Sequence, residues 1–456
     1  MEESRIDLAV IGCGVAGQSI AYTARKAGKS VSIFESGPPG GTCPTRGCDA
    51  KKPLVNAAKR LVQARAMIGS GLAGQLHLDW SALMDFKRQF TQPIPGRTRE
   101  DLREAGIELI EACPRFLDAH TLEADGRQWR AEQIVIASGL RPRTLELPGG
   151  GAEHTIDSDG FLELDQLPGR VVFVGGGYIA MEFAGVAAAA GARVTVLEMG
   201  TYPLGQFDQD VVRELLAAYE DLGVHVLTQR KVEAIRPLER GFEVDCGGAA
   251  PTIEADLVVN ATGRVPSIDG LDLDAAGIDH GKAGVKVDSH LRSVSQPHVW
   301  AAGDVADTGR PPLTPTASED GRVVAHNLLN PDALHEQIQT PVASVAFTLP
   351  PVASAGMSEQ AAREAHGDGI EVAAGSMAGW KHFRQQNEKH AYYKLIFDPD
   401  TKLIGAHLVG ADCDEVINMF ATALDSGCDK ASLCDTTLAY PTVGFNLQNV
   451  FAKQKK

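Results

Sequence analysis

Apolar residues fall in short runs that alternate with glycine-rich turns and helix-like stretches. Residues 6–11 form an apolar run typical of a strand buried on both faces. A glycine-rich turn at residues 12–17 follows, then a helical stretch to Lys26 and a strand at residues 30–34 that ends at Glu35. This order predicts a dinucleotide-binding fold, because the glycines let the backbone approach a pyrophosphate at the helix N-terminus.

The same pattern recurs in the middle of the chain. A strand is predicted at residues 170–174, a glycine-rich turn opens at Gly175, an Ala-rich helix runs to Ala190, and residues 193–197 form a strand ending at Glu198. Two such folds in one chain predict two bound dinucleotides with electrons passing between them. The alternative for the first turn is a glycine-rich loop without a ligand.

Two acidic residues occupy equivalent places in the two folds. Glu35 lies 21 residues after Gly14, and Glu198 lies 21 residues after Gly177. A carboxylate there is placed to bind ribose hydroxyls. Glu198 would repel a 2′-phosphate, and residues 199–205 offer no Arg or Lys to replace it, so the second fold is predicted to prefer NADH over NADPH.

The remaining pattern and the composition predict a large α/β protein. Residues 80–105 are predicted to form charged helix interrupted at Pro93 and Pro95, and residues 107–117 an edge strand of the first sheet. With 456 residues, 44% of them apolar, the chain suffices for about three domains.

The net charge and the distribution of cysteines indicate which binding partners and which cellular compartment to expect. The net charge of -16 disfavours nucleic acid and anionic membranes as partners. No apolar run approaches the ~18 residues that a membrane span needs, and a strand begins too early for a signal peptide. Eight mostly scattered cysteines favour reduced thiols and a cytoplasmic location.

One cysteine pair differs from the others. Cys43 and Cys48 are separated by a segment containing Pro44 and Gly47, and two lysines follow directly. We expect Cys48 to begin a helix, whose positive end and neighbouring lysines favour a thiolate. The pair is thus a candidate redox-active dithiol; a structural disulfide and half of a metal site are the alternatives.

These features together resemble the pyridine nucleotide-disulfide oxidoreductases, the family that includes dihydrolipoamide dehydrogenase, glutathione reductase and mercuric reductase. The resemblance extends over nearly the whole chain. Residues 134–139 and 260–266 resemble the two crossovers between the domains, and residues 302–304 resemble a second flavin motif. Residues 313–315 resemble the segment that faces the flavin pyrimidine, and residues 347–350 and 405–410 resemble strands of the dimerisation domain.

The resemblance implies an architecture and its ligands. It implies two Rossmann-like dinucleotide-binding domains plus a C-terminal α+β dimerisation domain, and hence a homodimer. FAD and NADH are the implied cofactors, and a small-molecule or carrier-bound disulfide or dithiol is the implied substrate. The implied segments are an FAD-binding domain (1–145), a nicotinamide domain (146–265), a second part of the FAD domain (266–336) and the dimerisation domain (337–456).

The resemblance also implies roles for individual residues. Hydride passes from NADH through FAD to a Cys43–Cys48 disulfide, with Cys48 nearer the flavin and Cys43 exchanging with the substrate. Glu182 pairs with Lys52, for which Lys51 is the alternative, near the flavin. The implied flavin ligands are Gly12, Gly14, Gly17, Glu35, Gly41, Thr42, Ser138, Gly139, Asp304, Leu313 and Thr314. The implied nicotinamide-dinucleotide ligands are Gly175, Gly177, Tyr178 (which also gates the flavin), Ile179, Ala180, Glu198 and Gly263.

The sequence departs from the family near its end. Where the family usually carries a histidine and, five residues later, a glutamate, this chain has Tyr440 and Phe445. A tyrosine with a pKa near ~10 donates a proton but is a poor base at neutral pH. The substitution therefore favours disulfide reduction over dithiol oxidation, unless Tyr440 only packs at an interface.

Two further departures bear on the substrate. Asp49 places negative charge beside the dithiol, which opposes thiolate formation. The chain ends without the cysteine pair usual in mercuric reductases, which disfavours mercury reduction. The main expectation is a reductase most like dihydrolipoamide dehydrogenase. The alternatives are a glutathione-reductase-like enzyme, a reductase of quinone or metal acceptors, and a slow redox-signalling flavoprotein.

Overall fold

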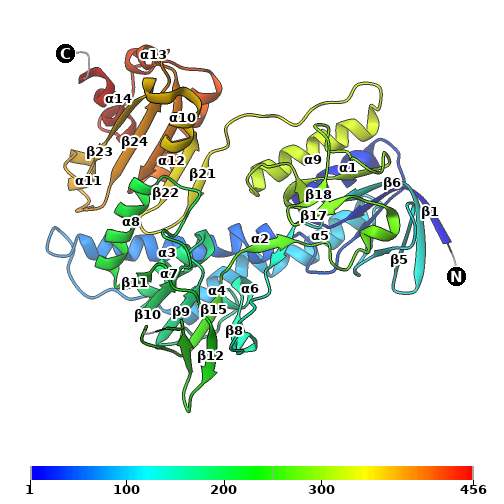
Figure 1. The fold of residues 1–456 in the computed structure, drawn as a ribbon, viewed down its shortest axis with the longest axis horizontal. Coiled ribbons are helices and arrows are strands. Elements are labelled where there is room, and N and C mark those ends of the chain that lie inside the picture. Colours follow the sequence, from blue (N-terminus) through cyan, green and yellow to red (C-terminus); the bar gives the residue numbers. More distant parts are fainter. Residues whose placement is uncertain (1–2, 249, 454–456) are drawn as a thin grey trace. The chain divides into compact units, whose positions relative to one another are not determined.

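The computed structural model describes residues 3–248 and 250–453, and the chain divides into two compact units (Figure 1). The first unit combines Met1–Lys52, Asp85–Arg143 and Gly263–Gln339, and the second combines Pro53–Met84, Thr144–Thr262 and Thr340–Lys456. The last three residues, which belong to the chain end discussed for mercury reduction, lie outside the described part. No helix within the described ranges is both long and apolar enough to cross a bilayer.

The first unit is built on a seven-stranded sheet in the order β3-β2-β1-β6-β5-β4, with β19 also paired to β6. The central strand β1 (Glu3–Ile11) runs parallel to β2 (Val31–Phe34) and β6 (Arg127–Ile136). The last four residues of β1 are all buried, as expected for a strand covered on both faces. The other strands of this sheet are β3 (Glu108–Ile110), β4 (Arg115–Phe116), β5 (Thr121–Ala124) and β19 (Val299–Ala301).

Two helices cross closely beside this sheet. In Figure 1, α1 (Val15–Lys26) and α9 (Thr314–Leu329) lie together, and both contribute to one apolar core with β1. A Cβ at Gly321 of α9 would lie only 3.1 Å from Cα of Ala16, so glycine allows this approach. The unit also contains α2 (Thr42–Arg46), the start of α3 (Cys48–Ala66), α5 (Pro93–Glu104), β7 (Leu140–Pro142), β16 (Arg264–Pro266), β17 (His280–Gly281), β18 (Gly284–Lys286) and β20 (Ala306–Asp307).

The second unit contains a parallel sheet and an antiparallel sheet. The parallel sheet has the order β11-β10-β9-β15-β8, and the predicted strands are β9 (Arg170–Val174) and β10 (Arg193–Leu197). The antiparallel sheet, β21-β22-β25-β24-β23, belongs to the C-terminal segment. Other strands are β8 (Thr155–Ile156), β11 (Val224–Leu227), β12 (Ala234–Pro237), β13 (Phe242–Asp245), β14 (Ile253–Ala255), β15 (Leu257–Asn260), β21 (Ser344–Ala346), β22 (Val352–Gly356), β23 (Glu371–Ser376), β24 (Tyr392–Phe397) and β25 (Leu403–Val409).

Helices cover both sheets of the second unit, and the predicted fold class is confirmed. Each unit has a sheet with a parallel core in which a buried strand leads into a glycine-rich turn, and an α+β domain lies C-terminal to both. The division into four segments stays a prediction. The longer helices are α7 (Tyr178–Ala189), α8 (Gln209–Leu222), α10 (Glu359–His366), α12 (Cys413–Asp425) and α14 (Val443–Lys453).

Two local expectations need correction. The single strand predicted at residues 107–117 is two strands, β3 and β4, because Pro114 between them has no N–H to continue a ladder. The charged helix breaks once, after α4 (Trp80–Thr91), and not twice. Pro93 begins α5 and Pro95 lies in its first turn, where the missing N–H costs nothing.

Trp129 tests the core of the first unit. Its side chain is fully buried on β6 and meets the ring of Phe34 edge to face at 5.1 Å. We expect Trp129→Ala to lower the free energy of unfolding of this unit by about 3–5 kcal/mol, through lost burial and an internal cavity. Urea denaturation measures the change. Leu238→Ala, at an exposed position, is the control and should stay within about 0.5 kcal/mol of the parent.

Candidate active site

The two candidate redox cysteines lie on consecutive helices. Cys43 is in α2, and α3 begins at Cys48, as predicted. A Cβ at Gly47, between them, would lie 2.9 Å from the carbonyl oxygen of Thr42 and 3.2 Å from Cα of Cys43. Any side chain at this position would push α2 and α3 apart, so glycine allows the two cysteines to approach.

One hydroxyl group contacts both sulfur atoms. The Oγ1 of Thr314 lies 3.3 Å from Sγ of Cys43 and 3.8 Å from Sγ of Cys48. Thr314 is the first residue of α9, and the N-cap residue Leu313 provides no side-chain hydrogen bond to that helix end. The N-terminus of a long helix carries partial positive charge, so the dithiol lies at an electropositive point of the first unit.

The two thiols behave as one acid. The hydrogen bond with Cys48, followed by burial, raises the pKa of Cys43, while the Thr314 hydroxyl opposes the rise. The charge of Asp49 raises this pKa further. A thiol that donates to a neighbouring sulfur keeps its proton while the neighbour carries the charge. In this dithiol state Cys43 is therefore a sulfur that holds its proton firmly.

The first glycine-rich turn forms a close backbone cradle. A Cβ at Gly12, whose φ is +111°, would lie 2.2 Å from the carbonyl oxygen of Ala137, and one at Gly17 would lie 2.1 Å from that of Gly12. Gly41 has φ of +80°, and a Cβ there would lie 2.5 Å from Cα of Gly14. The segment that carries Cys43 thus approaches the turn backbone to backbone. Gly14 caps α1 without a side chain, which leaves its first N–H groups open to a phosphate.

The acidic residues of the two nucleotide folds make the same pair of hydrogen bonds. Glu35 accepts from the backbone N–H of Cys13 at 2.9 Å and of Gly37 at 2.7 Å. Glu198 accepts from Gly176 at 2.6 Å and from Gly200 at 2.5 Å. Each carboxylate therefore ties its glycine-rich turn to the loop after the next strand. Each oxygen keeps a further lone pair, so binding of ribose hydroxyls stays a prediction for both.

Several polar groups near the first turn fit the FAD that the fold implies. The hydroxyl of Ser138 is buried and has no hydrogen-bond partner among the described residues, and the same holds for Thr316 in the first turn of α9. Asp304 is half-buried, and burial raises the pKa of its carboxyl group while Arg264 opposes the rise. Donors and acceptors without protein partners beside a close backbone cradle are what a bound dinucleotide would satisfy.

A supporting network around Asp304 was not foreseen from the sequence. Asp320 of α9 is almost fully buried and accepts from the N–H of Gly303 at 3.1 Å and from Gln337 at 2.8 Å. Arg310, also buried, bonds Glu319 at 2.9 Å and lies 3.8 Å from Asp320. These contacts hold the Gly303–Asp304 turn against α9. The sequence signal that could have indicated this network is the presence of acidic residues on a helix face that otherwise packs in the core.

The second glycine-rich turn has the geometry of the first. Gly175 has φ of +102°, and a Cβ there would lie 2.5 Å from the carbonyl oxygen of Ala261. Gly177 caps α7, and Tyr178 begins it. The next two predicted ligands, Ile179 and Ala180, lie in the first turn of that helix, and Gly263 follows β15 with φ of +113°. The structure thus places residues 175–180 at the helix N-terminus, whereas Gly263 belongs to the first unit, and contacts of all these residues with a nucleotide stay predictions.

Glu182 and Tyr440 differ from the simplest expectations for their surroundings. Glu182 is buried, not solvated, and accepts from the N–H of Phe347 at 2.8 Å. Its pairing with Lys52, which belongs to the other unit, stays a prediction. Tyr440 is 63% exposed, lies between two helices in neither a helix nor a strand, and meets the ring of Phe445 edge to face at 5.1 Å. An exposed phenol in the C-terminal segment is available for proton donation or for packing against another chain.

This arrangement defines a class of protein: enzymes that pass electrons between bound dinucleotides and a cysteine pair. Comparison with known proteins agrees. The model of the pyridine nucleotide-disulphide oxidoreductase family matches residues 6–321, and that of the family's dimerisation domain matches residues 342–450. The chain belongs to the pyridine nucleotide-disulphide oxidoreductase family.

Relatives and solved structures match over almost the full length. Glutathione reductase of Nostoc sp. is 31% identical over 96% of this chain and 97% of its own, and dihydrolipoyl dehydrogenase of Bacillus subtilis is 29% identical over 96% of each. The HOCl-induced flavoprotein disulfide reductase RclA from Escherichia coli has a TM-score of 0.87 at 28% identity, over 98% of this chain and 99% of that one. A Cu(II) complex of the same protein has a TM-score of 0.88 at 28% identity, over 99% of each chain.

Family membership establishes the general activity. The protein is a flavoprotein disulfide reductase that uses FAD and a pyridine nucleotide, and its dimerisation domain supports a homodimer. The predictions of the family, the fold class and the enzyme class are confirmed. The substrate and the choice between NADH and NADPH are not given by these matches.

Gly41 tests the close approach of the cysteine segment to the flavin turn. We expect Gly41→Ala to reduce the FAD bound per protein at least several-fold, because the new Cβ would strike Gly14. The ratio of flavin to protein absorbance in the purified protein measures this. Gly28→Ala is the matched control, since Gly28 also has a positive φ but nothing lies within 4 Å of its Cβ position. Equal flavin content in both variants would contradict the close approach.

The shared hydroxyl of Thr314 tests the electrostatics of the dithiol. Because this hydroxyl lowers the pKa of Cys43, Thr314→Val should raise that pKa and slow alkylation of Cys43 at a given pH. Cys48→Ser should act in the opposite direction, because the hydrogen bond with Cys48 is the main cause of the raised pKa. Alkylation rates against pH, with the label located by mass spectrometry, measure both shifts. Thr422→Val is the control and should leave the profile unchanged, because the exposed Thr422 hydroxyl bonds only the carbonyl oxygen of Asn418 within α12.

Proposed function

We propose that this protein is an NADH-dependent flavoprotein reductase of a small or carrier-bound disulfide, working chiefly in the direction of reduction. The observation that carries the proposal is the contact of one α9 hydroxyl with both sulfurs of the cysteine pair. It supports a dithiol held at the helix N-terminus that the family resemblance assigns to the flavin. Reduced, scattered cysteines support a cytoplasmic location.

The two cysteines have different roles in thiol–disulfide exchange with the substrate. When bound, FAD supplies a path for the electron pair of a hydride to reach the Cys43–Cys48 disulfide. Cys43 then attacks the substrate disulfide, passing its proton along the hydrogen bond to Cys48 and releasing the first substrate thiol. Cys48 next attacks the mixed disulfide, which releases the second thiol and closes the Cys43–Cys48 bond. One departing sulfur takes the proton that Cys48 gives up as it attacks, and the other takes a proton from outside the cysteine pair.

Tyr440 is the proposed proton donor for the departing thiols. Its exposure and its position in the dimerisation domain suit a residue that acts at a partner chain's site. A phenol gives a proton more readily than it takes one at neutral pH, which supports reduction over dithiol oxidation. Glu182 and Lys52 are proposed to pair near the flavin, where the pair would orient the nicotinamide.

Glu198 supports NADH as the reductant. Its carboxylate is fixed by two backbone N–H groups at the point where the family binds the adenosine ribose. A fixed negative charge there would repel a 2′-phosphate, and the following residues 199–205 carry no cation to offset it.

Substrate turnover tests the proposal directly. NADH consumption should be measured with lipoamide, glutathione disulfide and related disulfides, at several pH values. We expect turnover of at least one of them at roughly 10 per second. Tyr440→Phe should reduce turnover without changing flavin content. Absence of turnover with every disulfide, in enzyme that NADH reduces, would contradict the proposed substrate class.

A second candidate is reduction of a metal ion in place of a disulfide. The observation favouring it is the similarity to RclA, whose Cu(II) complex is solved, together with the missing histidine. A metal acceptor takes electrons without needing a proton for a departing thiol. No cluster of three or more potential ligands for a resident metal is present in the described ranges, so Cu(II) would be a substrate here. NADH-dependent Cu(II) reduction faster than any disulfide turnover would favour this candidate.

A further inference from the structure

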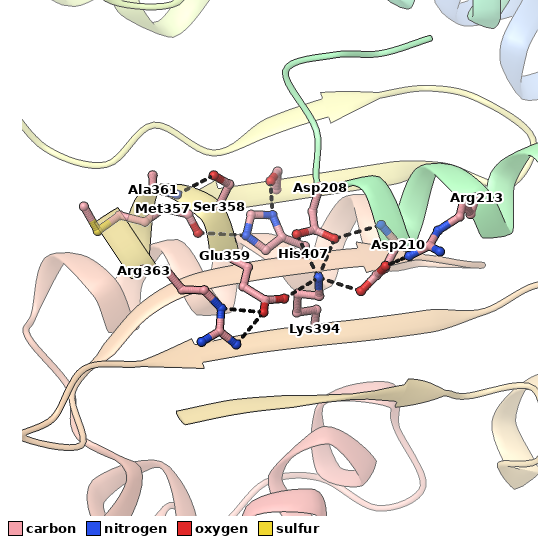
Figure 2. Close-up of polar contacts among 11 residues, drawn as sticks. Asp208, Asp210, Arg213, Met357, Ser358, Glu359, Ala361, Arg363, Lys394 and His407 are labelled. Atoms are coloured by element: carbon pink, nitrogen blue, oxygen red, sulfur yellow. Dashed lines mark hydrogen bonds and ion pairs between the residues drawn. The ribbon is translucent and has the colours of Figure 1, made fainter. Parts of the chain in front are cut away.

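A buried lysine joins the C-terminal sheet to the nicotinamide fold. Lys394 lies in the middle of β24, in an otherwise apolar and aromatic run, and is 4% exposed. Figure 2 shows its Nζ surrounded by carboxylates from two helices. It lies 3.0 Å from Asp208, 2.6 Å from Asp210 and 2.9 Å from Glu359. An ammonium group has three donors, and here each has its own carboxylate.

The charges of this cluster balance. We call Lys394, Asp208, Asp210, Glu359 and the two flanking arginines the Lys394 cluster. Arg363 donates two hydrogen bonds to Glu359, at 2.8 and 3.0 Å, and Arg213 donates to Asp210. Three cations therefore face three anions. A lysine buried to this extent is stable only with such partners, and removing it would leave carboxylates facing one another.

His407, the residue paired with Lys394 on the neighbouring strand, is kept neutral. His407 lies directly opposite Lys394 on β25 and is buried. Its Nε2 lies 2.9 Å from the carbonyl oxygen of Met357, and its Nδ1 contacts the hydroxyl of Ser354. Burial lowers the pKa of His407, so no second positive charge competes for the carboxylates.

The cluster holds the C-terminal end of a loop that contacts the second glycine-rich turn. Asp208 caps α8 by accepting from the N–H of Asp210 at 3.0 Å, and the loop at residues 199–207 directly precedes it. Within that loop the N–H of Leu204 donates to the carbonyl of Gly176 at 2.8 Å. A Cβ at Gly176 would lie 2.9 Å from Cβ of Pro203, so the loop rests on the glycine-rich turn.

We propose that Lys394 is a positioning residue for dinucleotide binding. Lys394 fixes the start of α8 and thereby the loop at residues 199–207. This loop contacts the second glycine-rich turn, which accepts the adenosine half of the dinucleotide. The C-terminal domain thereby sets the affinity for the reductant without touching it. This inference rests on the assignment of that turn to NADH in the proposed function.

The primary test is Lys394→Met, which keeps the length of the side chain and removes its charge. We expect the dissociation constants of NADH and of ADP-ribose, titrated against the full-length FAD-loaded protein, to rise about ten-fold. The flavin spectrum and the reduction by dithionite should not change. Lys394→Arg, which keeps the charge, should retain most of the affinity. Lys389→Met is the matched control, because Lys389 pairs with Asp221 near the opposite end of α8 and is largely exposed.

A second variant separates positioning from general destabilisation. Lys394→Met combined with Asp210→Asn and Glu359→Gln removes the repulsion between carboxylates. It does not restore the ion pairs that hold the start of α8 on β24. We expect thermal stability to recover in this variant while ADP-ribose affinity stays low. Recovery of both would overturn the proposal and leave Lys394 a structural residue.

The outcomes also separate this inference from the proposed function. If the parent protein binds NADH and Lys394→Met binds it within two-fold, the inference fails while the proposed function stands. If the parent binds NADPH and ADP-ribose but not NADH, the proposed reductant is wrong, and the ADP-ribose comparison still decides the inference. If the parent binds none of the three, both fail.

Discussion

The contact between the Thr314 hydroxyl and the two sulfurs is the interaction on which the account depends. It brings three segments that are distant in the sequence to one point: the cysteine helices, the N-terminus of α9 and, through Gly41 and Gly14, the first glycine-rich turn. Each approach is close enough that a Cβ would block it at Gly41 or Gly47. The chemistry therefore requires small residues as much as it requires cysteines.

The two nucleotide folds repeat one electrostatic design. In each, a carboxylate at the end of the second strand accepts backbone N–H bonds from the glycine-rich turn and from the loop that follows the carboxylate. Such a residue shapes the cradle before any ribose arrives. The designs differ in their supports. Asp320 and Arg310 of the first unit hold the Gly303–Asp304 turn, whereas the Lys394 cluster holds the loop beside the second turn.

Local sequence patterns predicted the helices and strands well. They predicted side-chain contacts between residues far apart in the sequence less well. The strands β9 and β10 and the start of α3 at Cys48 agree with the sequence prediction, because apolar runs and glycine-rich turns are local signals. The break at Pro114 was missed although proline carries a local signal. The buried state of Glu182 and the hydroxyl contacts of Thr314 depend on segments more than a hundred residues away. Nothing in their own neighbourhood in the sequence indicates those partners.

The most direct measurement of the central claim is the electron capacity of the purified enzyme. Anaerobic dithionite titration of the oxidised, FAD-loaded protein should consume twice as many electrons per flavin as free FAD does, because a disulfide beside the flavin accepts a second pair. Cys43→Ser should reduce the capacity to that of the flavin alone. A parent protein that takes up only the electrons of its flavin would show that the cysteine pair is not in redox contact with it, and would contradict the account.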